Sequence, residues 1–486
     1  MFFESLKVII DKLYYQRIYF YFTTIDMLDH KKFLEFYNNL DVDQLSSKTV
    51  LSFSQHITSY EFIRSVEQMM KSNTTSFYWN LPKDNFSFFA FDELLTFSNE
   101  DFDIDKTIGR NQAIKVFTNT KVTLEKEPLF VGGIKFPSTQ SDAIWKDFPS
   151  SIWFVPKLIL VKTESSYSLR YNFILDQQEV HHKIETVNEL LKIENHFTRN
   201  TNHVRINNIN SFSESDIHLW VKQINHVLKE ISRNKFSKVV IARQKKLEFA
   251  EPPEIFPEIQ KLESDYPNCY IFAFKKNDST FFGSSPERLF SISDGFLETD
   301  ALAGSAPRGK NFEEDKFLEE ELLTSEKNLA EHKSVVDFLL NRLTPISEKI
   351  LFDTQPSVKK FQNIQHIYSQ IRTKLKKETA IFTVLNKLHP TPAVCGMPQD
   401  SALASINQIE KFDRGLYSGV LGWFNLNNEG DFAVGIRSAV LNKNELRIFA
   451  GCGIVEGSES LSEYNETELK MKPILSLFEN ETISKS

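Results

Sequence analysis

The apolar and polar positions alternate differently in the two halves of the chain. Between residues 49 and 192 the apolar positions form short runs, rich in aromatic and β-branched residues, with polar turns between them. Such runs are typical of β-strands. The predicted strands of this half are residues 76–81, 86–91, 128–137, 151–161 and 168–173.

Helical periodicity is clearest in the second half. From Ile217 to Ile231 apolar residues recur every three or four positions, directly after the acidic and serine-rich segment 213–216. This pattern predicts a helix whose N-terminus lies at that segment. Residues 312–343 predict either one long helix or two shorter ones.

Further strands are expected around these helices. After His389 the pattern returns to strands, and residues 442–445 predict the turn of a hairpin between 432–441 and 446–450. The other strands predicted in this half are residues 237–243, 269–274 and 280–283. Long sets of strands with segregated helices favour an α+β fold over a doubly wound sheet.

The N-terminal residues are apolar but are interrupted by charges at Glu4, Lys7 and Asp11. They lack the basic start and unbroken apolar core of a secretion signal and are too charged to span a membrane, so we expect a cytoplasmic protein. Residues 1–45 predict a weakly helical extension, within which Met27 is an alternative start. The asparagine-rich segment 200–210 predicts a linker.

Composition and charge narrow the class of protein. The chain has 486 residues, with 57 basic and 65 acidic side chains, a net charge of −8 and 43 phenylalanines. The acidic balance argues against a nucleic-acid-binding surface, and it means that local cations must hold any anionic ligand. The phenylalanine content predicts a large apolar interior.

The three cysteines, Cys269, Cys395 and Cys452, are odd in number and widely spaced, without a Cys-x-x-Cys pair. This pattern predicts reduced, buried thiols rather than a disulfide framework or a zinc site. A nucleophilic role for Cys395 or Cys452 is the alternative.

Isolated charges lie within the apolar segments of residues 389–470. Arg437 lies within the apolar run 432–441, where a guanidinium needs a carboxylate or phosphate partner. Lys470 is a second candidate for binding an anion. The region therefore predicts a site lined with charge that takes a charged ligand.

Two further residues are candidates for acid–base chemistry. Lys238 precedes a strand that should be buried on both faces, where desolvation would lower its pKa from about 10.4 and make it a general base. A strand-end lysine that reaches solvent is the alternative. Glu287 lies at a turn that enters an apolar strand, where burial would raise its pKa and make it a general acid. An ion pair with Arg288 is the alternative.

Backbone and carboxylate groups complete the candidate set. The turn around Gly304 and Ser305 offers N–H groups that can bind an anion. Glu331 lies on the 312–343 helix, and Glu463, Glu466 and Glu468 cluster near the end of the chain. Carboxylates with few His or Cys neighbours favour Mg²⁺, and a solvated helix face is the alternative.

Seven motifs connect these candidates, and their order and spacing resemble the chorismate-utilising enzymes, the family of isochorismate, anthranilate, aminodeoxychorismate and salicylate synthases. The resemblance covers residues 213–477. The motifs are Lys238-Val-Val-Ile-Ala-Arg243, Gly283-Ser-Ser-Pro-Glu287, Ala301-Leu-Ala-Gly-Ser-Ala-Pro-Arg308, Ser325-Glu-Lys-Asn-Leu-Ala-Glu-His332, His389-Pro-Thr-Pro-Ala-Val394, Ala450-Gly-Cys-Gly-Ile-Val455 and Glu466-Thr-Glu-Leu-Lys470.

The loop after His389 distinguishes members of that family. Anthranilate-type members carry a proline-glycine-threonine or proline-alanine-glycine-threonine sequence, whereas Pro390-Thr-Pro-Ala-Val394 is similar to isochorismate synthases. The apolar Ala393 is consistent with an enzyme that leaves the enolpyruvyl ether intact. The chain departs from the family at Ser305, where threonine is common, and in its N-terminal extension.

The resemblance implies a role for each candidate. Lys238 would activate water for attack at C2 of chorismate, and Glu287 would protonate the departing C4 hydroxyl. Glu331 and Glu466 would hold Mg²⁺ at the ring carboxylate. The residues implied in substrate binding are Gly304, Ser305, Tyr417, Arg437, Gly451, Gly453 and Lys470.

The resemblance also implies a fold and a setting. Two large antiparallel β-sheets would pack together with flanking helices. Residues 46–200 would join the same core as the chorismate-binding region 213–477, and 200–210 would be an internal connection. We expect an isochorismate synthase of menaquinone or catechol-siderophore synthesis, a monomer or homodimer without an amidotransferase subunit, nucleic acid or membrane partner. The alternatives are a salicylate synthase, which eliminates pyruvate, and a chorismate-binding protein without turnover.

Overall fold

The computed structural model describes residues 29–39, 49–60, 66, 75–99, 115–118, 128–174, 209–213, 216–361 and 364–478. Within the predicted extension it describes helix α2 (His30–Asn38), where Phe33 packs edge-on against Phe53 at 5.3 Å between ring centroids. Met27 and most of the predicted linker 200–210 lie outside the described residues.

The strands of the first half confirm the five predicted there. They are β1 (Thr49–Ile57), β2 (Thr75–Leu81), β3 (Phe86–Asn99), β4 (Lys115–Thr118), β5 (Phe130–Ile134), β6 (Ser151–Lys162) and β7 (Tyr167–Ile174).

The second half alternates strands and helices. Its strands are β8 (Ile209–Ser213), β9 (Lys238–Phe249), β10 (Tyr270–Lys276), β11 (Ser279–Ser285), β12 (Arg288–Ser293), β13 (Phe296–Pro307), β14 (Ser347–Phe352), β15 (Ser357–Lys360), β16 (Ile364–Leu375), β17 (Gly396–Met397), β18 (Val420–Phe424), β19 (Gly430–Val434), β20 (Ser438–Asn442) and β21 (Glu445–Ile454). Its helices are α6 (Ile217–Ser232), α7 (Phe256–Asp265), α8 (Phe312–Thr324), α9 (Glu326–Leu343), α10 (Ile381–Leu388), α11 (Gln399–Ile409) and α12 (Ser460–Phe478).

The strands form two antiparallel series that meet at the long strands β3 and β6. One series runs β8, β9, β21, β20, β11, β10, β2 and β3, and the other leads from β6 through β5, β18, β19, β12 and β13 to β16. Because β6 pairs with both β3 and β5, the two expected sheets are joined in one hydrogen-bonded sheet of 21 described strands. Pairing of β2 with β10 and of β5 with β18 brings strands of both halves of the chain into this sheet.

Aromatic side chains fill the space between the two series. Phe77 and Phe281 come from the first series, and Trp423 comes from the second, and all three belong to one buried cluster. The predicted apolar interior is therefore largely this aromatic layer, which holds the two series face to face.

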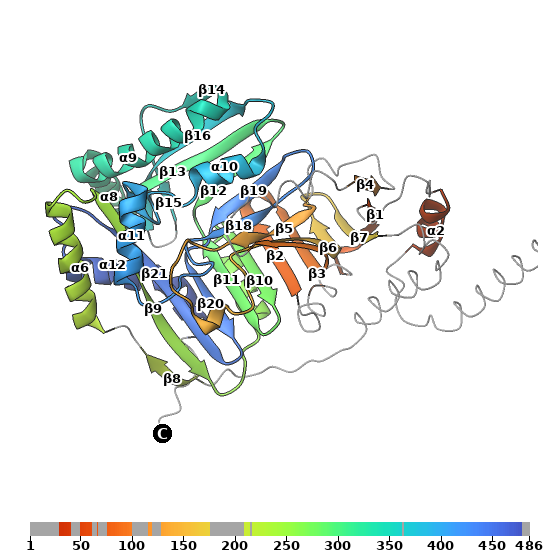
Figure 1. Ribbon diagram of the computed structural model, residues 1–486, viewed down its shortest axis with the longest axis horizontal. Helices are drawn as coiled ribbons and strands as arrows, with labels where there is room; N and C mark the ends of the chain where they lie inside the picture. The colour runs from red at the N-terminus through yellow and green to blue at the C-terminus, as the bar shows by residue number, and fades with distance from the viewer. Residues whose placement is uncertain are drawn as a thin grey trace, which may run out of the picture.

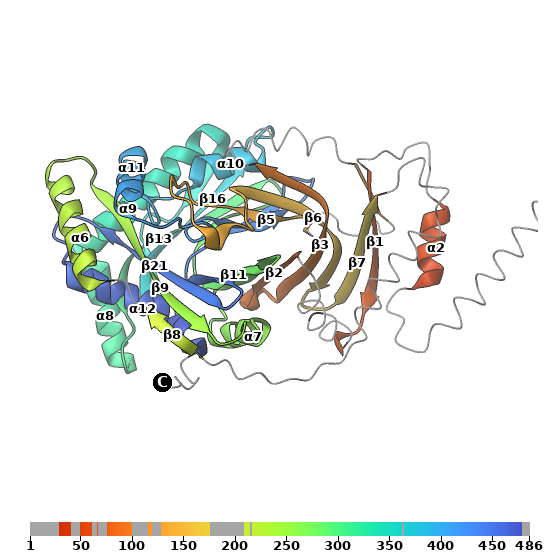
Figure 2. The same ribbon diagram turned by 60° about the horizontal axis from the view of Figure 1, so that its bottom comes forward.

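Helices cover the outer faces of the sheet (Figures 1 and 2). Helices α9 and α10 pack on the second series, α7 and α12 on the first, and α6 and α11 against β9 and β21. Within the described residues, none of these helices combines the length and apolar character that crossing a membrane would require.

Helix and turn positions decide one alternative of the sequence prediction and correct two further details. The 312–343 segment is two helices, separated at Ser325, whose side chain accepts a hydrogen bond from the Asn328 N–H at 3.3 Å. The region after His389 includes the helix α11 as well as strands. The predicted strand 432–441 is broken into β19 and β20, and Arg437 lies in the connecting turn with φ of 51°.

Candidate active site

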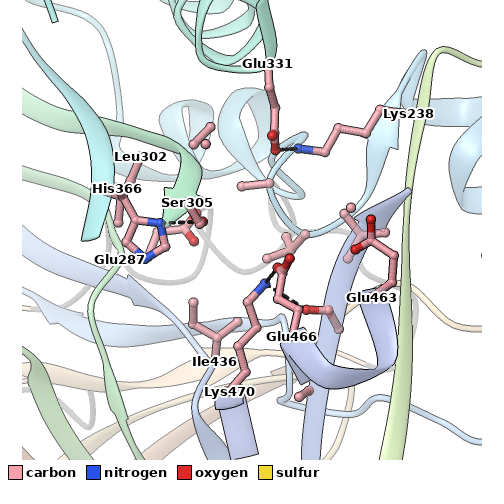
Figure 3. A pocket seen from close by; sticks show the side chains of 18 of the residues that line it. Lys238, Glu287, Leu302, Ser305, Glu331, His366, Ile436, Glu463, Glu466 and Lys470 are labelled. Atoms are coloured by element: carbon pink, nitrogen blue, oxygen red, sulfur yellow. Dashed lines mark hydrogen bonds and ion pairs between the residues drawn. The ribbon is translucent and has the colours of Figure 1, made fainter. Parts of the chain in front are cut away.

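All eleven predicted site residues line a single cavity of about 320 Å³ (Figure 3). Strands β9, β13, β16 and β21, helices α9 and α12, and the turns after β11 and β19 contribute to its wall. The volume suits a small metabolite, which sites of this size bury almost completely. The tertiary structure thus collects residues that are up to 232 positions apart, from Lys238 to Lys470.

Lys238 is the first residue of β9 and points into the cavity. Its side chain is 7% exposed, and its Nζ lies 2.7 Å from Oε1 of Glu331. It crosses the backbone at Gly453, where an added Cβ would lie only 2.6 Å from Lys238 Cε. The lysine therefore does not reach solvent, which was the alternative to a buried catalytic position.

Glu287 lies in the turn between β11 and β12 and is 8% exposed. Burial raises the pKa of Glu287 to about 7, although Lys238 and the Thr391 hydroxyl, 3.5 Å from Oε1, oppose the rise. Arg288 points elsewhere, since it donates to the Tyr270 hydroxyl at 2.9 Å and pairs with Glu298. The ion pair with Arg288 that was the alternative for Glu287 is therefore not formed, and the carboxyl can carry a proton near neutral pH.

Besides Glu287, three glutamates line the cavity: Glu331 from α9, and Glu463 and Glu466 from α12. Burial raises the pKa of Glu466, but Lys470, whose Nζ is 2.5 Å away, outweighs burial and lowers it. Burial and the like charge of Glu466 raise the pKa of Glu463. An added cation would relieve that repulsion.

These oxygen donors fit a hard divalent cation such as Mg²⁺, which prefers carboxylates, water and substrate oxygens. Among the described residues, no group of three or more His, Cys, Asp or Glu side chains is already gathered around a metal position. The protein donors would therefore need water or substrate oxygens to complete the coordination.

Arg437 and Lys470 supply positive charge on the same wall. Arg437 is 8% exposed, and burial lowers its pKa. Its backbone carbonyl accepts from the Ser284 N–H at 3.1 Å, but its guanidinium forms no hydrogen bond or ion pair within the described residues. Lys470 donates to the Gly451 carbonyl at 3.1 Å as well as pairing with Glu466. A buried guanidinium without a protein partner points to an anionic ligand.

A β-bulge shapes the wall at Gly304 and Ser305. The register between β13 and β16 shifts between Ala303 and Ser305, and Gly304 adopts φ of +76°. Ser305 Oγ lies 2.8 Å from Nδ1 of His366 on β16. Burial, Arg437 and Lys470 lower the pKa of His366 to about 3, so its imidazole is neutral.

The glycines of β21 leave space for neighbouring side chains of the site. A Cβ at Gly451 would lie 3.0 Å from the Tyr417 hydroxyl, and one at Gly453 would meet Lys238. Tyr417 is 3% exposed and stacks on Phe449 at 5.2 Å between centroids. Both glycines therefore make room for side chains of the site.

The residues of the cavity wall that were not predicted from the sequence include Glu463 and His366. Glu463 could have been selected, because it precedes Glu466 by three positions on a helix whereas Glu468 projects elsewhere. His366 carried no such signal, because the register that places it beside Ser305 is a tertiary feature.

The three cysteines confirm the prediction of reduced, buried thiols. Cys269, Cys395 and Cys452 are free and buried, and Cys452 lies in β21. Burial raises the pKa of Cys269 and of Cys395 to about 12. These thiols are protonated at neutral pH, which opposes a nucleophilic role.

The sequence is similar to proteins of one known family. A family model described as "Chorismate binding enzyme" matches residues 35–479. Isochorismate synthase MenF of Bacillus subtilis is 32% identical over 450 residues, which cover 89% of this chain and 94% of that protein. Salicylate biosynthesis isochorismate synthase of Pseudomonas aeruginosa is 38% identical over 254 residues, which cover 52% of this chain and 53% of that protein.

The fold also matches a solved structure, that of MenF, the menaquinone-specific isochorismate synthase from Escherichia coli. The TM-score is 0.72 at 23% sequence identity, and the match covers 92% of this chain and 100% of that chain. This likeness shows that the sheet with its flanking helices is shared.

Proposed function

The chain belongs to the chorismate binding enzyme family, and we propose that it is an isochorismate synthase, which converts chorismate reversibly to isochorismate. The observation that carries the proposal is the presence of Lys238 and a protonatable Glu287 in one cavity, together with Arg437, whose guanidinium forms no ion pair within the described residues. Full-length similarity to the Bacillus subtilis isochorismate synthase supports the same conclusion.

The proposed reaction moves a hydroxyl group without net consumption of water. Lys238 in its free-amine form takes a proton from a water molecule, whose oxygen forms a bond to C2 of chorismate. The ring double bonds shift, the C4–O bond breaks, and Glu287 donates its proton so that the C4 hydroxyl leaves as water. The pKa of about 7 for Glu287 suits this donation at neutral pH.

The remaining residues of the wall would bind the substrate's two carboxylates. Arg437 and Lys470 provide the charge, while Ser305 and His366 provide polar groups beside them. We propose that Glu331 and Glu466 hold Mg²⁺, which would supply positive charge at the ring carboxylate. Glu331 would then both coordinate the metal and pair with Lys238.

The test is incubation of the purified protein with chorismate, with and without Mg²⁺, followed by chromatographic separation of the products. Isochorismate that forms only with the metal is the expected result. Lys238→Ala and Glu287→Gln should each abolish its formation. Lys246→Ala is the matched control, because this lysine of the same strand pairs with Glu445 and does not line the cavity.

Other products would redirect the proposal. Salicylate together with pyruvate, detected with lactate dehydrogenase, would identify a salicylate synthase. Binding of chorismate without turnover would identify a binding protein. Unchanged activity in both active-site variants would overturn the acid–base assignment.

We propose a role in menaquinone synthesis within the cytoplasm, and a monomer or homodimer that needs no amidotransferase. The match to MenF spans 89% of the chain, whereas the match to the salicylate-biosynthesis enzyme spans 52%. Deletion of the gene should lower cellular menaquinone, and loss of a catechol siderophore instead would favour the other pathway. Size-exclusion chromatography with light scattering determines the oligomeric state.

A further inference from the structure

Helix α12 presents different side chains to the cavity and to strand β9. Glu463, Glu466 and Lys470 line the cavity. Glu468 follows Glu466 by two positions, so the two carboxylates project about 200° apart around the helix axis. Glu468 belongs to the motif Glu466-Thr-Glu-Leu-Lys470 but has no part in the proposed reaction.

The β9 side of α12 is held by a compact group of polar residues, which we call the β9–α12 clamp. Arg243 donates from Nε to the Thr467 hydroxyl at 2.6 Å and from Nη2 to Glu468, and its guanidinium lies 3.8 Å from the centre of the Tyr464 ring. Lys245 Nζ pairs with the other oxygen of Glu468 at 2.6 Å. The clamp consists of Arg243, Lys245, Tyr464, Thr467 and Glu468.

Burial makes the geometry of the clamp specific. The side chains of Arg243 and Lys245 are only 3% and 4% exposed, and both cations pair with the Glu468 carboxylate. A rotation or slide of α12 would break the ion pairs of Glu468 with both cations.

The clamp also fixes the position of α12 relative to the rest of the site. Strand β9 carries Lys238 at its start and Arg243 five residues later, so one strand positions both the base and the helix. The start of α12 is fixed separately, where Trp220 donates to the Ser460 carbonyl at 2.9 Å. The clamp therefore acts on the middle of α12, next to Glu466.

We propose that Arg243 is a positioning residue, which fixes the rotation of α12 through Thr467 and Glu468 so that Glu466 is presented to the metal ion. This inference rests on the proposed function, in which Glu466 is a Mg²⁺ ligand. Outer residues that orient metal ligands typically contribute about 10–100-fold to metal affinity or activity. Loosening the clamp should weaken metal binding by an amount in this range.

The test compares Arg243→Met with Arg447→Met in the full-length protein. Arg447 lies on the neighbouring strand β21, is 19% exposed and pairs with Glu445 and Asp142. It is therefore a partly buried arginine ion pair that is not part of the cavity lining. Mn²⁺ binding is measured directly by electron paramagnetic resonance, and the Mg²⁺ concentration for half-maximal isochorismate formation is measured alongside. The chorismate KM is then determined at saturating metal.

We expect Arg243→Met to raise both the Mn²⁺ dissociation constant and the Mg²⁺ concentration for half-maximal activity about 10-fold or more. The chorismate KM should change by less than about 3-fold. Arg243→Lys should restore part of the metal affinity, and Arg447→Met should leave it unchanged. Unchanged Mn²⁺ binding in a folded Arg243→Met protein would overturn the inference, even if its activity fell.

Thr467→Val keeps all charges and the side-chain shape but removes the hydrogen bond from Arg243. If Arg243→Met does not fold, this variant takes its place, with the same expected direction and the same contradicting result. The wild type separates the two proposals. Failure of wild-type protein to bind Mn²⁺ or to form isochorismate would contradict the proposed function, whereas normal wild-type binding with unaffected variants contradicts only the clamp.

Discussion

Replacing Glu287 with glutamine should stabilise the protein at alkaline pH while removing its activity. The Glu287 carboxyl has a pKa of about 7 in the folded protein, against 4.5 for an ordinary glutamate, because burial disfavours its charged form. Between these two values the folded state holds a proton that the unfolded chain has released. Stability therefore falls as the pH rises through this window.

The magnitude follows from the two pKa values. At about 1.4 kcal/mol per pKa unit, the difference between 4.5 and about 7 costs the wild type about 3 kcal/mol of folding free energy above pH 7. Below pH 4.5 the carboxyl is protonated in both states and the cost vanishes. Glutamine is neutral at every pH, so Glu287→Gln removes this cost while keeping a polar group of similar shape next to Thr391.

The assay is urea unfolding of the wild type and Glu287→Gln at pH 5 and pH 8.5. The variant should gain about 2–3 kcal/mol relative to the wild type at pH 8.5 and much less at pH 5. Glu378→Gln is the control, because Glu378 is exposed and should give no pH-dependent gain. An equal effect of Glu287→Gln at both pH values would refute the idea that burial keeps this carboxyl protonated, and with it the physical basis for a general acid.

Two further substitutions test other parts of the site, and a third tests a buried ion pair outside the cavity lining. Arg437→Met should raise the chorismate KM about 10-fold or more, measured by steady-state kinetics, and leave the free energy of unfolding in urea unchanged or higher, since the buried guanidinium has no partner among the described residues. An unaffected KM would contradict this. Gly453→Ala should lower kcat at least about 10-fold in a folded protein, because its Cβ would displace Lys238, and a normal kcat with an unchanged circular dichroism spectrum would argue against this contact. Arg414→Met should cost about 3–5 kcal/mol in urea unfolding, since it leaves the Glu410 carboxylate, 3% exposed, without the cation that it pairs with, and a loss below about 1 kcal/mol would show that the buried pair is dispensable.

Local sequence features predicted much of the secondary structure. The α6 helix begins where the acidic segment predicts it, because Asp216 accepts a hydrogen bond from the His218 N–H and the apolar face follows at helical spacing. The hairpin at residues 442–445 also forms, with Asn442 paired to Glu445. These features depend on neighbours within a few positions, which the sequence displays directly.

Arg437 shows where local reasoning failed. The apolar run around it predicted a strand, yet the chain turns at this residue with φ of 51°. The turn lets β19 pair with β12 and β18 while β20 pairs with β11 and β21, so the two strands join different series of the sheet. No pattern within the run itself specifies that division.

The sequence by itself determined which residues have the chemistry for this site: a lysine and a glutamate in apolar settings, paired carboxylates and cations near the end of the chain, and motifs that resemble one family. Only the tertiary structure decided their partners. Lys238 meets Glu331 across 93 positions, and Glu468 turns away from Glu466 toward Arg243. The physical reason is that residue type and periodicity are local properties, whereas strand register and helix rotation are fixed by packing and by the pairing of buried charges.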